Sequence, residues 1–171
     1  IQSAILSGDR EFGVSLIKLD EEMDHGPIIK KEKIEPSPVN PTYKELEKKF
    51  AQMGGKMVCE IFLKNEEIKY EPQKEAGATY CKKIEKKDGF IEPDIFLGNN
   101  VNTDEVVLAE RKVRALNPDP GTFTILKTDK KELRIKITKA KIEDGKFIPE
   151  IITPEGKKEM SWENFLKGNK L

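Results

Sequence analysis

The residues of this chain best suited to acid–base chemistry lie in a short acidic segment between two apolar runs. Four carboxylates occur within five residues, at Asp20, Glu21, Glu22 and Asp24. Carboxylates this close raise one another's pKa, and an apolar pocket would raise one of them further. A carboxyl group with a raised pKa can transfer protons near neutral pH. We therefore consider Asp24 a candidate general acid–base residue.

The same segment can also be an ordinary turn. Asp24 precedes His25, Gly26 and Pro27, and aspartate, glycine and proline are typical turn residues. Gly26 can take a positive φ and so let the backbone approach a ligand. His25 is the single histidine of the chain, and we interpret it as a turn residue.

The elements that would position this loop are two strands and a helix. Residues 13–19 and 28–34 are short apolar runs of strand length. Residues 40–63 carry apolar side chains at steps of three and four, which predicts a helix with one buried face. Gly54 and Gly55 interrupt that helix, and we expect close packing against the sheet to be the reason. This part has too few strands to close a parallel α/β domain.

The second half of the chain predicts a separate domain, residues 80–171, joined to residues 1–64 by a linker at 65–79. A helix is predicted over residues 102–116 with Asn102 as its cap. Strands are predicted near residues 122–128, 133–137 and 147–153, followed by a helical turn that begins at Ser161. One helix with several short strands suits a small open β-barrel.

Composition narrows the class of protein. The chain has 31 Lys and Arg and 31 Asp and Glu, so its formal net charge is zero. No apolar stretch approaches the roughly 18 residues that a membrane-spanning helix needs, and no signal segment begins the chain. We expect a cytoplasmic protein without a membrane partner. Cys59 and Cys81 are expected to be free thiols, and two cysteines with one histidine predict no metal site.

Four sequence strings occur in an order and spacing shared with one family. They are Ile1-Gln2-Ser3-Ala4-Ile5, Gly13 followed by Asp24-His25-Gly26, Arg114-Ala115-Leu116-Asn117-Pro118-Asp119-Pro120-Gly121, and Thr153-Pro154-Glu155-Gly156-Lys157-Lys158-Glu159-Met160-Ser161. With them the chain resembles the 10-formyltetrahydrofolate-dependent formyltransferases, and among these the enzymes that act on methionyl-tRNA. The resemblance covers nearly the whole chain.

The resemblance implies an α/β plus β fold. Residues 1–64 would be the C-terminal part of a Rossmann-like formyltransferase domain, and residues 80–171 an OB-like barrel that binds tRNA. Asp24 would relay protons while a formyl group passes from 10-formyltetrahydrofolate to the amino group of initiator methionyl-tRNA. The loop would border the pterin pocket, largely through its backbone. Its residues are Leu19, Asp20, Glu21, Glu22, Met23 and Asp24.

Basic residues of the second half are the predicted contacts to tRNA phosphates. Residues 80–171 hold 19 Lys and Arg against 16 Asp and Glu, a mild excess that suits a polyanion. The candidates are Lys127, Lys130, Lys136, Lys157 and Lys158. Lysines beside strands are otherwise ordinary solvated residues.

The chain departs from the family pattern in several places. Lys18 stands where an apolar or aromatic residue is expected, and Asp119 stands where the family usually has Trp, which puts any contact of that ring in doubt. An Asn-x-His pair and a folate-binding Ser-Leu-Leu-Pro string, which precede the Ile-Gln segment in the family, do not occur here. We therefore expect the chain to be inactive, or nearly so, by itself. We also expect it to be a monomer.

Other functions remain open at this point. One is a formyltransferase that acts on an amino sugar nucleotide. Another is a non-catalytic RNA-binding module, and a third is an α+β domain without a site. The sequence upstream of Ile1 would distinguish between these possibilities.

Overall fold

The computed structural model describes residues 1–64, 68–74, 76–99, 102–127 and 132–169. Contacts divide the chain into two compact units. The first holds residue 1 and residues 9–82, and the second holds residues 2–8 and residues 83–171. The domain limits predicted above remain predictions, because compactness by itself does not show which segment folds independently.

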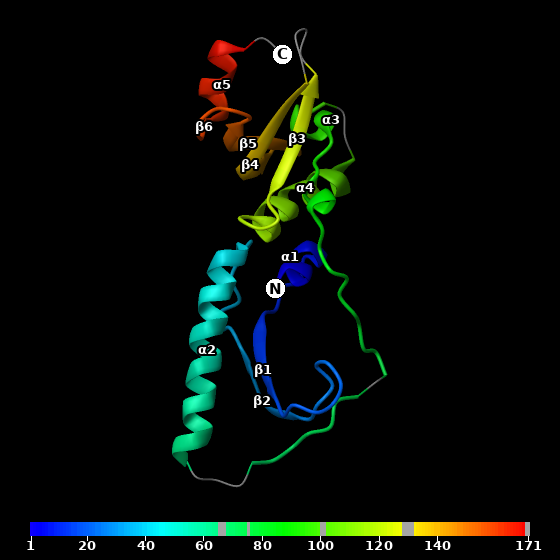
Figure 1. Ribbon diagram of the computed structural model, residues 1–171, viewed down its shortest axis with the longest axis vertical. Coiled ribbons are helices and arrows are strands. Elements are labelled where there is room, and N and C mark those ends of the chain that lie inside the picture. The colour runs from blue at the N-terminus through cyan, green and yellow to red at the C-terminus, as the bar shows by residue number, and fades with distance from the viewer. Residues whose placement is uncertain (65–67, 75, 100–101, 128–131, 170–171) are drawn as a thin grey trace. The chain divides into compact units, whose positions relative to one another are not determined.

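The first unit is a two-stranded antiparallel sheet beside a long helix (Figure 1). Strand β1 (Gly13–Ile17) pairs with β2 (Ile28–Lys33), and helix α2 (Tyr43–Lys64) packs along β1. The predicted order of strand, loop, strand and helix is therefore confirmed.

The core of the first unit is small. Its buried apolar side chains, among the described residues, include Phe12, Ile34, Leu46 and Met57, of which Leu46 and Met57 are fully buried. A polar contact adds to them, because Nζ of Lys30 on β2 donates to Glu60 on α2 at 2.5 Å. This pairing raises the pKa of the Lys30 ammonium. The sheet and helix thus hold together through few contacts, so the loop between the strands needs local support.

Helix α2 begins with a capping box at Thr42. The backbone N–H of Thr42 donates to Oε2 of Glu45 at 2.8 Å, and the N–H of Glu45 donates to Oγ1 of Thr42 at 3.3 Å. Inside the helix, a Cβ built on Gly54 would lie 3.9 Å from Val14, and one on Gly55 would meet nothing within 4 Å. The predicted close packing is therefore wrong for Gly55, and Gly54 has room for a methyl group.

The second unit contains a four-stranded antiparallel sheet in the order β3-β4-β5-β6. The strands are β3 (Thr122–Lys127), β4 (Glu132–Glu143), β5 (Lys146–Pro154) and β6 (Met160–Ser161). The three predicted strands are present, and β4 is longer than expected because its pairing with β5 continues to the hairpin turn.

The predicted OB-like barrel is not confirmed. A barrel requires its first and last strands to pair, and in the described part of the chain this sheet stays open. The outer edge of β3 is met by residues 90–91, where the N–H of Ile91 donates to the carbonyl of Phe123 at 2.8 Å. The opposite edge ends in β6, which is only two residues long.

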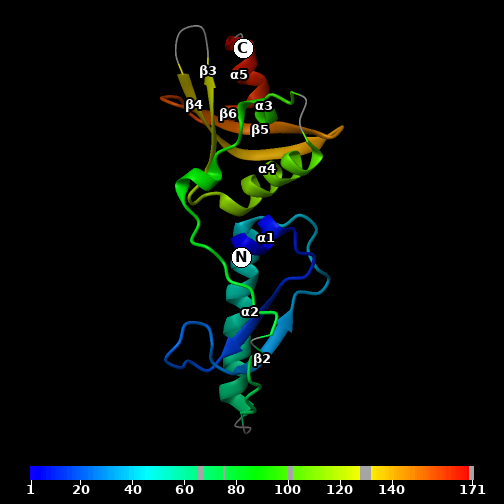
Figure 2. The ribbon, with the colours of Figure 1, turned by 90° about the vertical axis from the view of Figure 1, so that its right-hand side faces the viewer.

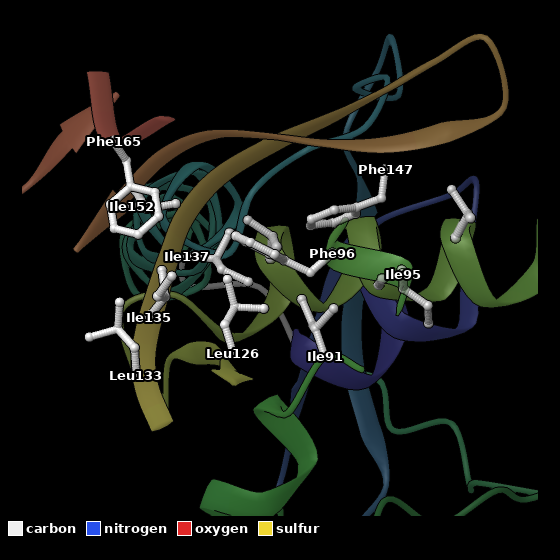
Figure 3. Packing of buried hydrophobic residues seen from close by; sticks show 13 residues of the cluster. Ile91, Ile95, Phe96, Leu126, Leu133, Ile135, Ile137, Phe147, Ile152 and Phe165 are labelled. Carbon is white, nitrogen blue, oxygen red and sulfur yellow. The ribbon is translucent and has the colours of Figure 1, made fainter. Parts of the chain in front are cut away.

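Helices cover one face of this sheet. The largest is α4 (Thr103–Leu116), which lies across β4 and β5 (Figure 2) and begins at the predicted cap, Asn102. Helices α3 (Pro93–Phe96) and α5 (Trp162–Gly168) complete the cover. Their apolar side chains meet those of the strands in one cluster (Figure 3). Its labelled members are Ile91, Ile95, Phe96, Leu126, Leu133, Ile135, Ile137, Phe147, Ile152 and Phe165.

A short N-terminal helix, α1 (Gln2–Ser7), packs on α4 and was not predicted. The guanidinium of Arg111 donates to the last carbonyls of α1, at 3.4 Å from Leu6 and 3.3 Å from Ser7. Gly8 then ends the helix with φ of 77°. Residues from the start of the chain are thus built into the unit formed mainly by its end.

Candidate functional site

The loop between β1 and β2 has a strained, closely packed backbone. Asp24 takes a left-handed conformation with φ of 57°. A Cβ on Gly26 would lie 1.7 Å from the carbonyl oxygen of Lys18, so only glycine fits there. Gly26 does not have a positive φ. A positive φ is therefore not the reason for this glycine, which instead allows the loop to approach the carbonyl of Lys18 closely.

Two side chains brace the loop from within. Oδ1 of Asp20 accepts the N–H of Glu22 at 3.0 Å, and Oδ2 lies 2.8 Å from Nδ1 of His25. The hydrogen bond with His25 lowers the pKa of Asp20 below its ordinary value. The expectation that neighbouring carboxylates raise the pKa is therefore wrong for Asp20. His25 lies in the turn, as expected, and it also pairs with a residue of the predicted pterin loop.

A segment from the predicted linker holds the loop from outside. The side-chain amide of Gln73 donates to the carbonyls of Asp24 at 2.7 Å and Gly26 at 2.8 Å. Glu71 exchanges backbone hydrogen bonds with Ile28 at 2.7 and 2.8 Å, next to the start of β2. Sequence reasoning missed this contact, because no strand periodicity marks these residues.

The six predicted folate-binding residues, Leu19–Asp24, lie on this one loop and are all exposed. Leu19 is 85% exposed and Met23 is 92% exposed. The loop therefore presents the Asp24 carboxylate together with two uncovered apolar side chains. Such a surface suits one wall of a site in which a flat ring lies next to a proton-accepting group.

On the face of the second unit's sheet that α4 does not cover, an aromatic ring lies next to basic side chains. The guanidinium of Arg134 on β4 lies 3.7 Å from the ring centroid of Phe123 on β3, a cation–π contact. Lys136 is exposed opposite Phe123 in the strand register. Phe123 and Arg134 were not predicted, although the alternation of apolar and basic residues in β4 could have pointed to Arg134.

The other predicted lysines differ in their surroundings. Lys157 and Lys158 are exposed in the turn after β5, and this turn starts beside Arg134, whose carbonyl accepts the N–H of Glu155. Nζ of Lys127 lies 3.9 Å from Oε1 of Glu132, so the carboxylate offsets part of the lysine charge. Lys130 falls outside the described residues.

A separate hollow of about 470 Å³ lies between α4 and the segment that contains α3. Lys112 lines it, donates from Nζ to the carbonyl of Phe90 at 2.9 Å, and has a pKa lowered by burial. No residue predicted to do chemistry lines this hollow, so we place the candidate site at the Asp24 loop.

Comparison with known proteins decides the family. Residues 1–62 match the family model described as formyl transferase. The chain is 36% identical over 147 residues to a methionyl-tRNA formyltransferase of Kosmotoga olearia, covering 85% of the chain and 43% of the relative. It is 39% identical over 144 residues to the methionyl-tRNA formyltransferase of Buchnera aphidicola, covering 83% of the chain and 41% of that relative. Residues 1–62 therefore belong to the formyltransferase family.

The matched relatives are longer than this chain, which covers only part of each of them. A relative from Carboxydothermus hydrogenoformans, 31% identical over 196 residues, matches 98% of the chain, which covers 58% of that relative. The chain thus spans about half the length of the curated formyltransferases that it matches.

Solved structures share the mixed α/β fold with antiparallel sheets. Methionyl-tRNA formyltransferase from Clostridium thermocellum aligns with a TM-score of 0.64 and 20% identity, over 90% of this chain and 60% of that one. HypX from Aquifex aeolicus in complex with tetrahydrofolic acid aligns with a TM-score of 0.60 and 18% identity, over 96% of this chain and 31% of HypX.

Among the described residues, no three or more His, Cys, Asp or Glu side chains are arranged so that they could hold a metal ion. In the same described ranges, no helix is both long and apolar enough to cross a membrane.

Proposed function

We propose that this chain belongs to an enzyme that transfers a formyl group from 10-formyltetrahydrofolate to the amino group of initiator methionyl-tRNA, a step of translation initiation. Residues 1–64 would form the C-terminal part of its Rossmann-like catalytic domain. The observation that carries the proposal is the Asp24 loop, which holds an exposed carboxylate beside the uncovered side chains of Leu19 and Met23. The names of the curated relatives support the choice of substrate.

In this proposal Asp24 moves one proton. The amine nitrogen of the aminoacyl-tRNA forms a bond to the formyl carbon, and the bond from that carbon to N10 of the folate breaks. Asp24 accepts the proton that the amine loses, and that proton finally resides on N10, directly or through water. The exposed position of Asp24 agrees with such a relay, because a carboxylate buried in its own unit could not reach a substrate.

The second unit would bind the tRNA. Its open sheet face presents Arg134 stacked on Phe123, with exposed Lys136 in the neighbouring position and the turn of Lys157 and Lys158 beside it. Cationic side chains with an aromatic platform suit a phosphate backbone and unstacked bases. We propose that this face makes the contact without a closed barrel, and that the enzyme works as a monomer in the cytoplasm.

The test of the catalytic proposal is Asp24→Asn in the natural gene product that contains these residues. Asparagine also tolerates a left-handed backbone, so the loop should keep its shape. We expect kcat for formylation of methionyl-tRNA to fall by about 100-fold or more, because the proton acceptor is lost. Asp144→Asn is the matched control, since Asp144 is likewise exposed and has φ of 52° in a turn of the second unit. Normal turnover of Asp24→Asn would refute the proposal.

Substrate choice is tested with the same enzyme. Formylation of an amino sugar nucleotide in preference to methionyl-tRNA would favour the sister activity. Binding of tRNA without any formylation by the natural gene product would favour a non-catalytic RNA-binding module. We expect the 171-residue chain by itself to show no measurable formylation.

A further inference from the structure

We propose that Gln73 is a positioning residue for the Asp24 carboxylate, so that the segment following α2 is part of the catalytic site rather than a passive linker. The catalytic part of this inference rests on the proposed function, whereas the structural part concerns the loop itself. The geometry that carries it is one amide nitrogen shared by two carbonyls of the loop.

The Gln73 contact uses every donor that the side chain has. A glutamine amide carries two N–H bonds. Nε2 of Gln73 lies 2.7 Å from the carbonyl oxygen of Asp24 and 2.8 Å from that of Gly26, so each acceptor can take one hydrogen. The two carbonyls lie on either side of His25, and fixing both of them sets the direction in which the Asp24 side chain leaves the backbone.

The Asp24 backbone needs such support. A left-handed φ of 57° is sparsely populated for a residue other than glycine. Gly26 restricts the loop on one side, where its backbone meets the carbonyl of Lys18. Gln73 restricts it further, because it donates to two carbonyls that would otherwise accept hydrogen bonds from water.

Gln73 is itself held in place by its neighbours. Glu71 pairs with Ile28 in antiparallel fashion, so the residue two positions later lies opposite the residue two positions before Ile28. This register sets Gln73 across from Gly26. Tyr70 adds a contact on the same segment, because Nζ of Lys18 lies 5.3 Å from its ring centroid. The contacts of Glu71 and Tyr70 fix the backbone near Gln73 independently of its amide. A positioning residue requires such support.

The inference depends on the amide and not merely on a side chain of this size. Gln73→Glu keeps the shape but replaces the donor with an acceptor that faces two carbonyl oxygens. Gln73→Met keeps nearly the same length without any donor or charge. If the amide positions Asp24, both variants should release the loop, and the glutamate variant should release it more because of repulsion.

The structural test is amide hydrogen exchange of residues 18–28 in the 171-residue chain, where the N–H groups of Lys18, Glu22 and Ile28 are hydrogen-bonded. We expect exchange there to accelerate by about 10-fold or more in Gln73→Glu and Gln73→Met, since a loop opening that loses 1.4 kcal/mol of support becomes tenfold more populated. Gln52→Glu is the matched control, because Gln52 is exposed on α2. Exchange that stays unchanged in both Gln73 variants overturns the inference.

The catalytic test uses the natural gene product. Misplacing a catalytic group costs up to about 100-fold in rate, so we expect kcat per folded molecule to fall by about 10-fold to 100-fold in both Gln73 variants. A structural role alone would lower the fraction of folded enzyme and leave kcat per folded molecule intact. Normal kcat in both Gln73 variants, beside an inactive Asp24→Asn, overturns the positioning role. An active Asp24→Asn refutes the proposed function instead, and the exchange result then decides whether Gln73 holds the loop.

Discussion

Nδ1 of His25 lies 2.8 Å from Oδ2 of Asp20 and joins the two ends of the loop that carries Asp24. The single histidine of the chain therefore has an identifiable partner within the predicted pterin loop. Together with the contacts of Gln73, this pairing holds the backbone around Asp24 while its side chain stays exposed.

The Asp20 pairing predicts a pH effect. The hydrogen bond with His25 lowers the pKa of Asp20 in the folded chain below the ordinary value of 3.8. The contribution of this pair is therefore fully present above 3.8 and is lost as the pH falls through the lower, folded-state pKa. Carbon NMR of the Asp20 carboxyl group should show a midpoint below 3.8, and His25→Ala should move it upward. A midpoint at or above 3.8 in the unchanged chain would contradict the prediction.

Replacement of Gly55 by Ala should stabilise the chain. A Cβ at this position meets nothing within 4 Å, and the glycine lies inside helix α2. Alanine is favoured over glycine in a helix by up to about 1 kcal/mol, partly because it restricts the unfolded chain. Urea unfolding should show a gain of about 0.5–1 kcal/mol. Gly26→Ala is the contrasting variant, and it should destabilise the chain because its Cβ would collide with the carbonyl of Lys18.

Arg111 should control the attachment of helix α1. Arg111→Gln removes the charged donors that reach the carbonyls of Leu6 and Ser7. We expect faster hydrogen exchange in residues 2–8 and a loss of about 1 kcal/mol in the free energy of unfolding, which is typical of one net hydrogen bond. Arg10→Gln is the control, since Arg10 is exposed. Equal effects of the two variants would show that α1 does not depend on the Arg111 contact.

Binding of tRNA should depend steeply on salt, with Lys136 as one contributor. Each phosphate contact adds about 1 to the slope of log binding constant against log salt. Lys136→Gln should therefore lower that slope by about 1. Lys139→Gln should lower it less, because Nζ of Lys139 already lies 3.1 Å from a carboxylate oxygen of Glu150. A tRNA-binding constant of the unchanged protein that does not vary with salt concentration would refute the proposed tRNA face.

The sequence by itself determined the local elements and the family. Helix α4 begins at its predicted cap, Asn102, because capping depends on the cap residue and the amide two positions later. The strands that flank the acidic loop follow from apolar runs of strand length. The motif strings pointed to the formyltransferases, and the family match and the curated relatives agree.

Only the tertiary structure decided how distant segments meet. Gln73 reaches Asp24 across 49 positions of the chain, and Arg111 reaches Leu6 across 105. Residues 90–91, which lie more than 30 positions before Phe123 in the chain, pair with it at the edge of β3. Periodicity and turn chemistry report on neighbours within a few residues. Contacts between distant segments depend instead on how whole elements pack, which local patterns in the sequence do not encode.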